Sequence, residues 1–313
     1  MFRFIGRRLI ACAVLVVVIA GITFLLAFSG TSNVARNLLG ESATPDQLAA
    51  KNAELGLDKP LLAQLGTWAQ NALHGDLGIS WFTNEPVSQA IANRLPVTLS
   101  MVVLAVALTA LISVGLGVAA AVRGGWLDRV IQVLSVAGFA LPNFWVALVL
   151  VVFFSVTLGV LPATGYVRLS ESPGSWAAAL VLPVASLVIG STASAAQQVR
   201  GAVIDVLRQD FVRTLRARGI SPRSVLFRHA LRNAAIPALT VLSLQFIALL
   251  GGAVVIEKVF AIPGLGTLTI NAALQGDVPV LMGVVVTLVV LVVIVNLVID
   301  VVSGWVNPKV RVQ

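Results

Sequence analysis

The sequence contains little of what stabilises soluble or secreted domains. It has one cysteine, Cys12, so neither an internal disulfide framework nor a cysteine-based metal cluster can form within the chain. Charged residues are also scarce, at 11%, whereas 58% of the residues are hydrophobic. This balance lies far from that of a soluble globular protein. The composition therefore indicates a chain whose natural solvent is lipid.

A P-loop for ATP is also absent, because its phosphate-binding lysine must follow a glycine. The four lysines, Lys51, Lys59, Lys258 and Lys309, follow Ala50, Asp58, Glu257 and Pro308. Gly115, Gly117 and Ala120 match part of a dinucleotide fingerprint, but no strand precedes them, and close helix packing explains them better. No carboxylate pair or metal-ligand cluster is evident. We expect no enzymatic activity and no metal or cofactor in this chain.

Long apolar stretches dominate the rest of the sequence. A bilayer core about 30 Å thick requires roughly 20 apolar helical residues, because the backbone there must satisfy its own hydrogen bonds. Six stretches meet this requirement: Leu9 to Phe28, Pro96 to Val122, Val130 to Leu161, Trp176 to Ala196, Pro237 to Ile256 and Val278 to Val302. Pro142 and Pro183 predict kinks or unwound turns in the third and fourth stretches. The sequence predicts an all-α polytopic membrane protein with six transmembrane helices.

The distribution of basic residues predicts the orientation. With both termini inside, the inner segments hold 15 of the 21 lysines and arginines and the outer segments hold six. This bias predicts cytoplasmic termini. It also explains the formal charge of +8 without nucleic acid, because the basic residues lie between apolar stretches and not on one soluble face. His74 and His229 then fall on opposite sides of the membrane and cannot share a site.

These signals divide the chain into four predicted parts. Residues 1–28 form an N-terminal transmembrane helix, 29–95 an external region with short amphipathic helices, 96–302 a five-helix core, and 303–313 a cytoplasmic tail. In the external region, Thr44 and Gln47 predict a capping box for a helix that starts at Pro45 and ends at Gly56. A second helix is predicted from Asp58 and Pro60 to Leu73. Its apolar stripe, Leu61, Leu65, Trp68 and Leu73, is most simply a packing face.

The segment 198–234 is the longest predicted cytoplasmic segment and contains eight arginines. Leu207, Phe211 and Leu215 repeat every four residues, which predicts an apolar ridge on one helix. Gly219 predicts a left-handed turn, after which Ser221 and Pro222 start a second short helix. A basic segment beside a membrane can serve only as an orientation signal. The ridge and the turn favour a protein-docking site instead.

The segment also carries a family resemblance. "DFVRTLRARGISPRSVLFRHALRNAAIP", from Asp210 to Pro237, resembles the coupling segment of binding-protein-dependent ATP-binding-cassette permeases, in particular the dipeptide, oligopeptide and nickel branch. "RLPVTLSM", "GGAVVIEKVFAIPGLG" and "NLVIDVVSGWVNPKVR" extend the resemblance over most of the chain. It implies a type I importer permease in the bacterial inner membrane.

The resemblance also implies partners and site residues. The partners would be a homologous second permease, two ATPase domains that carry ATP and Mg, and an external solute-binding protein, all beside membrane lipid. In that family the EAA loop docks into the ATPase, and Arg213, Thr214 and Leu215 stand at its name residues, with leucine where alanine is frequent. The residues expected to couple the chain to the ATPase are Leu207, Asp210, Phe211, Arg213, Thr214, Leu215, Arg216, Ala217, Arg218, Gly219, His229 and Leu231.

The solute itself is left open by the sequence, since the family includes peptide, nickel, glutathione and opine importers. Polar residues within the predicted spans are candidates for the solute path, namely Gln132, Asn143, Ser155, Gln245 and Asn296. An ion-coupled secondary transporter is the main alternative, and it would place a carboxylate inside the membrane. Glu257, Asp277 and Asp300 lie near span ends, which disfavours that alternative.

Overall fold

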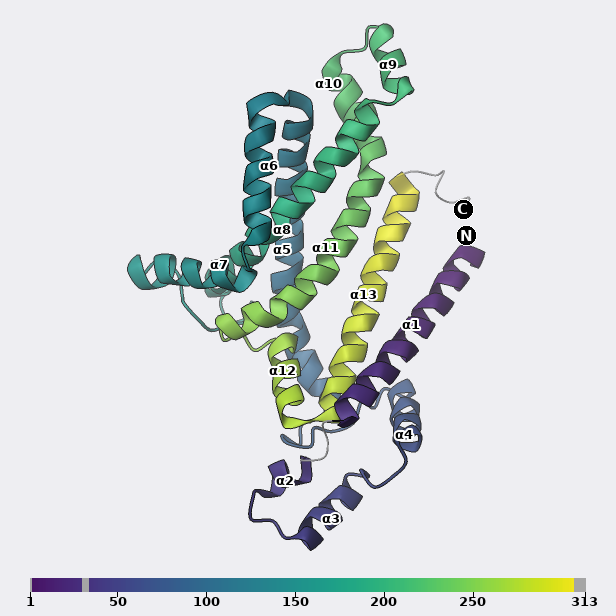
Figure 1. The fold of residues 1–313 in the computed structure, drawn as a ribbon, viewed down its shortest axis with the longest axis vertical. Helices are drawn as coiled ribbons and strands as arrows, with labels where there is room; N and C mark the ends of the chain where they lie inside the picture. Colours follow the sequence, from purple (N-terminus) through teal and green to yellow (C-terminus); the bar gives the residue numbers. More distant parts are fainter. Residues whose placement is uncertain (1, 30–33, 307–313) are drawn as a thin grey trace. The chain divides into compact units, whose positions relative to one another are not determined.

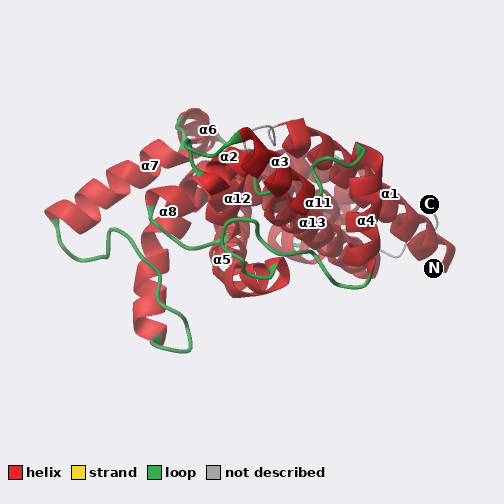
Figure 2. Ribbon diagram, turned by 90° about the horizontal axis from the view of Figure 1, so that it is seen from below, coloured by secondary structure: helices red, strands yellow, loops and turns green. Residues whose placement is uncertain are grey.

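The computed structural model describes residues 2–29 and 34–306. Most of the predicted tail 303–313 lies outside them. Within these ranges the chain is helical, and the only extended pairing is an isolated bridge between Ile79 and Pro86 (Figure 2). The helices are α1 (Phe2–Ser29), α2 (Val34–Leu39), α3 (Pro45–Glu54), α4 (Leu61–Leu73), α5 (Val87–Arg123), α6 (Gly125–Ala140), α7 (Asn143–Leu150), the π-helix η2 (Val151–Thr157), α8 (Pro173–Leu207), α9 (Asp210–Ala217), α10 (Pro222–Ser224), the π-helix η3 (Val225–Ala230), α11 (Leu231–Val259), α12 (Leu265–Gln275) and α13 (Val278–Val306) (Figure 1).

Four described helices are long and apolar enough to cross a membrane. They are α5, α8, the part of α11 from Pro237 to Val259 and the part of α13 from Val278 to Ser303. The helices Asp128–Gly138 and Asn143–Thr157, bent by more than 40°, make a fifth if they form one span. The apolar part of α1, Ala13–Phe28, is shorter. Each of the six predicted apolar stretches therefore contains helix. That all six cross the membrane stays a prediction.

Proline acts differently at the two predicted breaks. At Pro142 the helix ends: Leu141 is extended, with φ −84° and ψ 124°, as expected for a residue before proline, and α7 starts at the next residue after Pro142. At Pro183 the helix does not unwind, because α8 runs through it, and the alternative of a kink stays a prediction. The Ser186 hydroxyl, one turn further along, donates to the Pro183 carbonyl at 2.7 Å.

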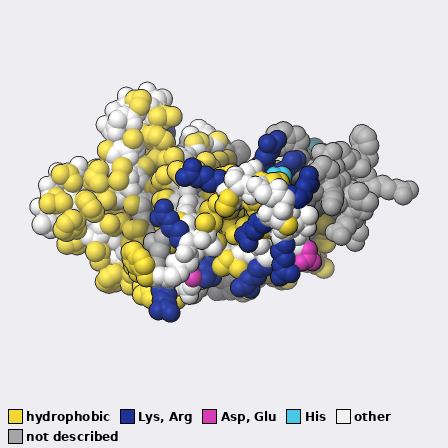
Figure 3. Space-filling model, turned by 90° about the horizontal axis from the view of Figure 1, so that it is seen from above, with side chains coloured by type: hydrophobic (Ala, Val, Ile, Leu, Met, Phe, Trp, Pro, Cys, Tyr) yellow, Lys and Arg dark blue, Asp and Glu magenta, His cyan; other side chains and the backbone are white. Residues whose placement is uncertain are grey.

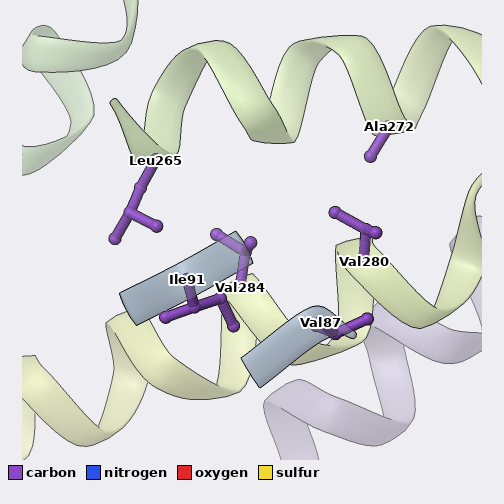
Figure 4. Packing of buried hydrophobic residues seen from close by; sticks show 6 residues of the cluster. All are labelled: Val87, Ile91, Leu265, Ala272, Val280 and Val284. Atoms are coloured by element: carbon purple, nitrogen blue, oxygen red, sulfur yellow. The ribbon is translucent and has the colours of Figure 1, made fainter. Parts of the chain in front are cut away.

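The described chain divides into two compact units. The first comprises residues 1–97 and 263–293. Its core joins the start of α5 to α12 and α13 through Val87, Ile91, Leu265, Ala272, Val280 and Val284 (Figure 4). Glycine at 283 lets α13 approach the start of α5 closely, since a Cβ there would overlap the Val87 side chain. This unit therefore owes its compactness to closely packed aliphatic side chains.

The short helices of the first unit form largely as predicted. The capping box at α3 is present, with the Thr44 nitrogen donating to Gln47 Oε1 at 2.9 Å, and α4 ends at Leu73. Leu65 and Trp68 of α4 pack against Phe24 and Met282, so the packing interpretation is confirmed for them. Leu61 and Leu73 are exposed, because α4 buries only the central part of the predicted stripe.

A buried carboxylate anchors the start of α13 in this unit. Asp277 is 2% exposed, and it accepts hydrogen bonds from the Ser80 hydroxyl at 2.5 Å and from the Trp81 nitrogen at 3.4 Å. Burial raises the pKa of the Asp277 carboxyl, and the bond from Ser80 opposes that rise. The hydrogen bonds to the Asp277 carboxyl thus come from a loop nearly 200 residues away in the sequence.

The second unit comprises residues 98–262 and 294–313, with α8 at its centre. Helix α8 packs against α6, α7 and α11 (Figure 1). It has many buried residues, among them Leu187, Ala195 and Val203. By contrast, the outward faces of α5 and α6 expose large apolar side chains such as Leu111 and Val133. Apolar exposure on this scale is expected of helices that face lipid.

Candidate functional site

The arginine-rich segment forms a helix, a sharp turn and a second helix. Helix α9 ends at Ala217, and Gly219 follows in the left-handed region at φ +77°. The Gly219 nitrogen donates to the Arg216 carbonyl at 3.0 Å, and the Ile220 nitrogen donates to the Leu215 carbonyl at 3.2 Å. These two bonds form a Schellman motif, which needs a left-handed residue at the position of Gly219. The predicted glycine turn is confirmed.

The prediction of one helix carrying Leu207, Phe211 and Leu215 is wrong. Helix α8 ends at Leu207, and Gln209 is extended (φ −68°, ψ 150°) before α9 begins at Asp210. Leu207 and Phe211 pack inward against Val203 and Ala230 instead of forming an outward ridge. Val212 of α9 is fully buried and was not among the predicted coupling residues.

The outward face of α9 carries four of the other predicted coupling residues. Asp210, Arg213, Thr214 and Ala217 follow the i, i+3, i+4, i+7 spacing of one helix face, and all four are exposed. Asp210 and Arg213 form an exposed ion pair at 3.3 Å, which orients the two side chains but adds little stability. Arg218 is exposed as well. Lysine and arginine side chains gather on the end of the molecule that carries α9 and α10 (Figure 3). The face has the geometry of a polar docking surface.

The second helix starts as predicted but is not short. The Ser221 hydroxyl accepts from the Ser224 nitrogen at 3.4 Å and caps α10, with Pro222 at its first position. The helix then continues through η3 into α11, because no glycine occurs before Gly251 and the helix tolerates Pro237. His229 in η3 and Leu231 in α11 are half-buried, and Leu231 packs on the same cluster as Phe211. The turn is thus joined directly to a membrane helix.

A polar cavity lies within the same unit. Its volume is about 350 Å³, and the bend between α6 and α7, helix α8 and helix α11 contribute its walls. Two predicted solute-path residues, Asn143 and Gln245, line it together with Ser191 and Ser194. The two serines were not predicted to lie on the solute path. Gly190 and Ser194, which both line the cavity, stand one helical turn apart and therefore lie on the same face of α8. A cavity of this size can hold a small polar solute.

Two close approaches fix Asn143 at this cavity. A Cβ on Gly190 would overlap Asn143 Oδ1, and a Cβ on Gly252 would lie 3.5 Å from Asn143 Nδ2. The amide is therefore held between α8 and α11 by the two glycines. The bend between α6 and α7 adds a hydrogen-bond acceptor, the carbonyl of Gly138, because Pro142 has no N–H to donate to it. Gly138 also lines the cavity. The cavity offers both donors and acceptors to a solute.

The other three predicted solute-path residues lie elsewhere. Gln132 donates to Asp128 at 3.0 Å, and Asp128 in turn pairs with Arg200 through a bond of 2.6 Å from Arg200 Nη2. Asn296 accepts a hydrogen bond from Ser243, and Ser155 lies in the π-helix η2. None of the three lines the cavity around Asn143. Gln132 and Asn296 instead join neighbouring side chains, as most polar residues in membrane helices do.

One buried carboxylate in this unit belongs to a structural contact. Glu257 of α11 is 0% exposed and accepts from the Thr98 hydroxyl of α5 at 2.6 Å. The two residues are 159 positions apart, and the bond ties two membrane helices together. In the described part of the chain, no group of three metal-ligating side chains lies close enough to hold an ion.

Comparisons with known proteins agree with this architecture. Residues 112–312 match the family model described as binding-protein-dependent transport system inner membrane component, and residues 1–102 match the model of its N-terminal region. A putative peptide transport system permease protein of Brucella abortus is 40% identical over 312 residues, covering 99% of both chains. A glutathione transport system permease protein of Salmonella choleraesuis is 36% identical over 314 residues, covering 99% of both.

The fold also matches a solved structure. An inward-facing structure of the MetNI methionine ABC transporter aligns with a TM-score of 0.58 and 20% identity, covering 71% of this chain and 99% of that one. At this identity the match concerns the fold. The two family matches together span nearly the whole sequence. The chain belongs to the family of binding-protein-dependent transport system inner membrane components and is a multi-pass permease subunit of an ATP-binding-cassette importer.

Proposed function

We propose that this permease imports peptides or peptide-like solutes such as glutathione. The observation that carries the proposal is that the docking segment, residues 210–230, packs on the same two long helices, α8 and α11, that line the polar cavity elsewhere along their length. Phe211 of α9 packs on the cluster that holds Val203 of α8 and Ala230 of η3. The same two long helices, α8 and α11, supply Ser191 and Gln245 to the cavity. A displacement of α9 would therefore be transmitted along these two helices to the cavity.

The chain needs partners to use this linkage. With no P-loop in the sequence, ATP and Mg belong on separate ATPase subunits, which we expect to contact the exposed face of α9. An external solute-binding protein would deliver the solute. A homologous second permease would complete the pathway. These partners follow from family membership and from the exposed polar face of Asp210, Arg213 and Thr214.

The cavity lining suits a peptide better than an ion. Amide and hydroxyl groups from Asn143, Gln245 and Ser191 can donate to and accept from backbone amides, and each such bond adds on the order of 1 kcal/mol. No carboxylate lines this cavity, whereas a proton-coupled site would place an ionisable group there. The peptide and glutathione permeases among its relatives support the same solute class.

The proposal predicts peptide uptake that depends on ATP. In proteoliposomes containing the permease pair, the ATPase subunits and the binding protein, we expect labelled di- or tripeptides to accumulate only with ATP present. The chain purified alone should hydrolyse no ATP. Accumulation driven by a sodium or proton gradient without ATP would show that the alternative, a secondary transporter, is correct.

The Gly190→Ala variant tests the role of the cavity in this uptake. The new methyl group would displace the Asn143 amide, so we expect uptake to fall by about tenfold, the effect of losing one or two hydrogen bonds. ATPase co-purification should be unchanged. The matched control is Gly201→Ala on the same helix, where a Cβ meets nothing within 4 Å. Equal uptake by the two variants would mean that the solute passes elsewhere.

Both termini and α9 are proposed to lie on the cytoplasmic side, as the 15-to-6 distribution of basic residues favours. In a Cys12→Ser background, a single cysteine at Asp58 should react with an impermeant reagent added outside intact cells. A cysteine at Arg218 should react only after the membrane is opened. Labelling of both from outside would contradict the orientation.

A further inference from the structure

A second cavity lies beside the docking segment in the same unit, and no step of the proposed transport uses it. Its volume is about 530 Å³. The end of α5, the turn to α6, the last part of α8 and the segment from Arg216 to Leu226 line it. Its walls are partly apolar, with Val122, Ile204 and Leu207 among them. It is separate from the polar cavity around Asn143, with which it shares no lining residue.

The charge in this cavity is strongly positive. Four arginines line it, Arg200, Arg208, Arg216 and Arg223, against a single aspartate, Asp128. Asp128 is bound by Arg200 and by Gln132, so its charge is already balanced. Among the described residues, no ion pair involves Arg208, Arg216 or Arg223. Three arginines therefore line one hollow without an ion-pair partner among the described residues.

The position of the cavity identifies the kind of anion. Trp126, at the turn between α5 and α6, is 75% exposed, and Val122 beside it is 52% exposed. An exposed tryptophan at the end of an apolar helix marks the membrane–water interface. The arginines of the cavity thus lie close to headgroup depth, with an apolar surface beside them that can receive acyl chains. Basic pockets between membrane helices bind anionic headgroups in this way.

The docking face for the ATPase is a different surface. On the helical wheel of α9, Arg216 lies next to the buried Val212 and about 110° from the centre of the face formed by Asp210, Arg213, Thr214 and Ala217. We propose that the cavity lined by Arg208, Arg216 and Arg223 binds the phosphate group of an anionic phospholipid. This assignment rests on the proposed orientation, with the docking segment at the cytoplasmic leaflet.

Such a lipid would connect membrane composition to coupling. Its phosphate would contact Arg208 at the end of α8, Arg216 on α9 and Arg223 at the start of the second helix. The headgroup would therefore brace the turn around Gly219 from its membrane side. Because guanidinium groups bind phosphate oxygens through paired hydrogen bonds, we expect arginine at these positions to bind the lipid phosphate moderately more tightly than lysine.

The test measures lipid retention by the purified full chain and needs no transport. The chain in detergent is mixed with equal amounts of phosphatidylglycerol and phosphatidylcholine that carry the same acyl chains, and bound lipid is quantified by native mass spectrometry. We expect wild type to retain phosphatidylglycerol selectively. The double variant Arg208→Gln/Arg223→Gln should lose affinity by about 25-fold, at about fivefold for each basic residue near the headgroups.

A matched variant removes the same charge from the same segment but outside the cavity. Arg228→Gln/Arg232→Gln alters two exposed arginines that do not line it, and we expect less than about a twofold loss. Arg208→Lys/Arg223→Lys should keep most of the retention, which separates loss of charge from misfolding. Equal losses in the two Gln pairs, or no loss in either, would overturn the proposal.

Two further outcomes name a different occupant. Displacement of phosphatidylglycerol from wild type by millimolar inorganic phosphate, with no preference for lipid, would assign the cavity to a soluble phosphate and overturn the lipid proposal. Loss of ATPase co-purification in Arg208→Gln/Arg223→Gln with unchanged lipid retention would place the cavity in the ATPase interface, with the same consequence. A failure of peptide uptake in the reconstituted importer would not change the lipid retention measured on the purified chain, so the two proposals can fail separately.

Discussion

Replacing Gly219 with valine is expected to reduce solute-stimulated ATP hydrolysis and uptake together by about an order of magnitude. Gly219 has φ +77°, and a Cβ there would meet nothing within 4 Å, so the penalty comes from the backbone alone. A β-branched residue in the left-handed region costs on the order of 1–2 kcal/mol, which is about a tenfold shift in the population of the turn. The Schellman bonds to Arg216 and Leu215 would be lost with it. The measurement is uptake and stimulated hydrolysis at matched membrane abundance.

The matched control for this variant is Gly219→Asn. Asparagine tolerates the left-handed region, so this variant should keep most of the activity although it also adds a side chain. Both variants should reach the membrane in normal amounts, since no residue of a membrane helix changes. Wild-type activity in Gly219→Val would show that the segment is only a basic loop beside the membrane. Equal loss in both variants would show that the docking surface excludes any side chain there.

Replacing Gly117 with alanine is expected to have the largest effect on stability. A Cβ at Gly117 in α5 would lie 2.8 Å from the Ala196 carbonyl oxygen and 2.8 Å from Val199 Cγ1 of α8. Backbone atoms cannot rotate away, so the two helices must separate. Overpacking of this kind costs about 1–3 kcal/mol. Thermal denaturation of the purified chain in detergent, followed by tryptophan fluorescence, should show a lower midpoint.

Gly115→Ala provides the comparison. It lies two residues away in the same helix, and a Cβ there meets nothing within 4 Å. Its midpoint should stay within experimental error of wild type or rise slightly, because alanine favours the helix. If both variants unfold at the same temperature, the α5–α8 contact does not limit stability. The same pair of glycines forms part of the apparent dinucleotide fingerprint, which the structure explains as helix packing at Gly117 only.

Local signals in the sequence predicted local structure well. The capping box at Thr44 and Gln47 and the turn at Gly219 formed because each depends on residues within one turn of helix, whose backbone requirements are fixed by chemistry. Pro142 likewise marked a helix end. A helix end without glycine or proline carries no such local signal. Arg208 and Gln209 break the helix between Leu207 and Asp210, so the four-residue spacing was misleading.

Contacts across long sequence separations could not be predicted in this way. Asp128 and Arg200 are 72 residues apart, and only the packing of α6 on α8 brings them together. Ser191 and Ser194 looked unremarkable, because serines in membrane helices commonly bond to their own backbone, as Ser191 does to the Leu187 carbonyl at 2.7 Å. Their place in the cavity depends on the bend at Pro142, whose direction a single sequence does not specify.

The π-helix η3 changes how this segment should be compared between relatives. A π-helix contains one more residue per turn than an α-helix and is equivalent to a single-residue insertion. Each residue of an α-helix turns the chain by about 100°, so loss of one residue between Val225 and Ala230 would rotate α9 by that angle about the axis of α11. A one-residue gap at this point of an alignment would therefore mark a permease that presents another face to its partner.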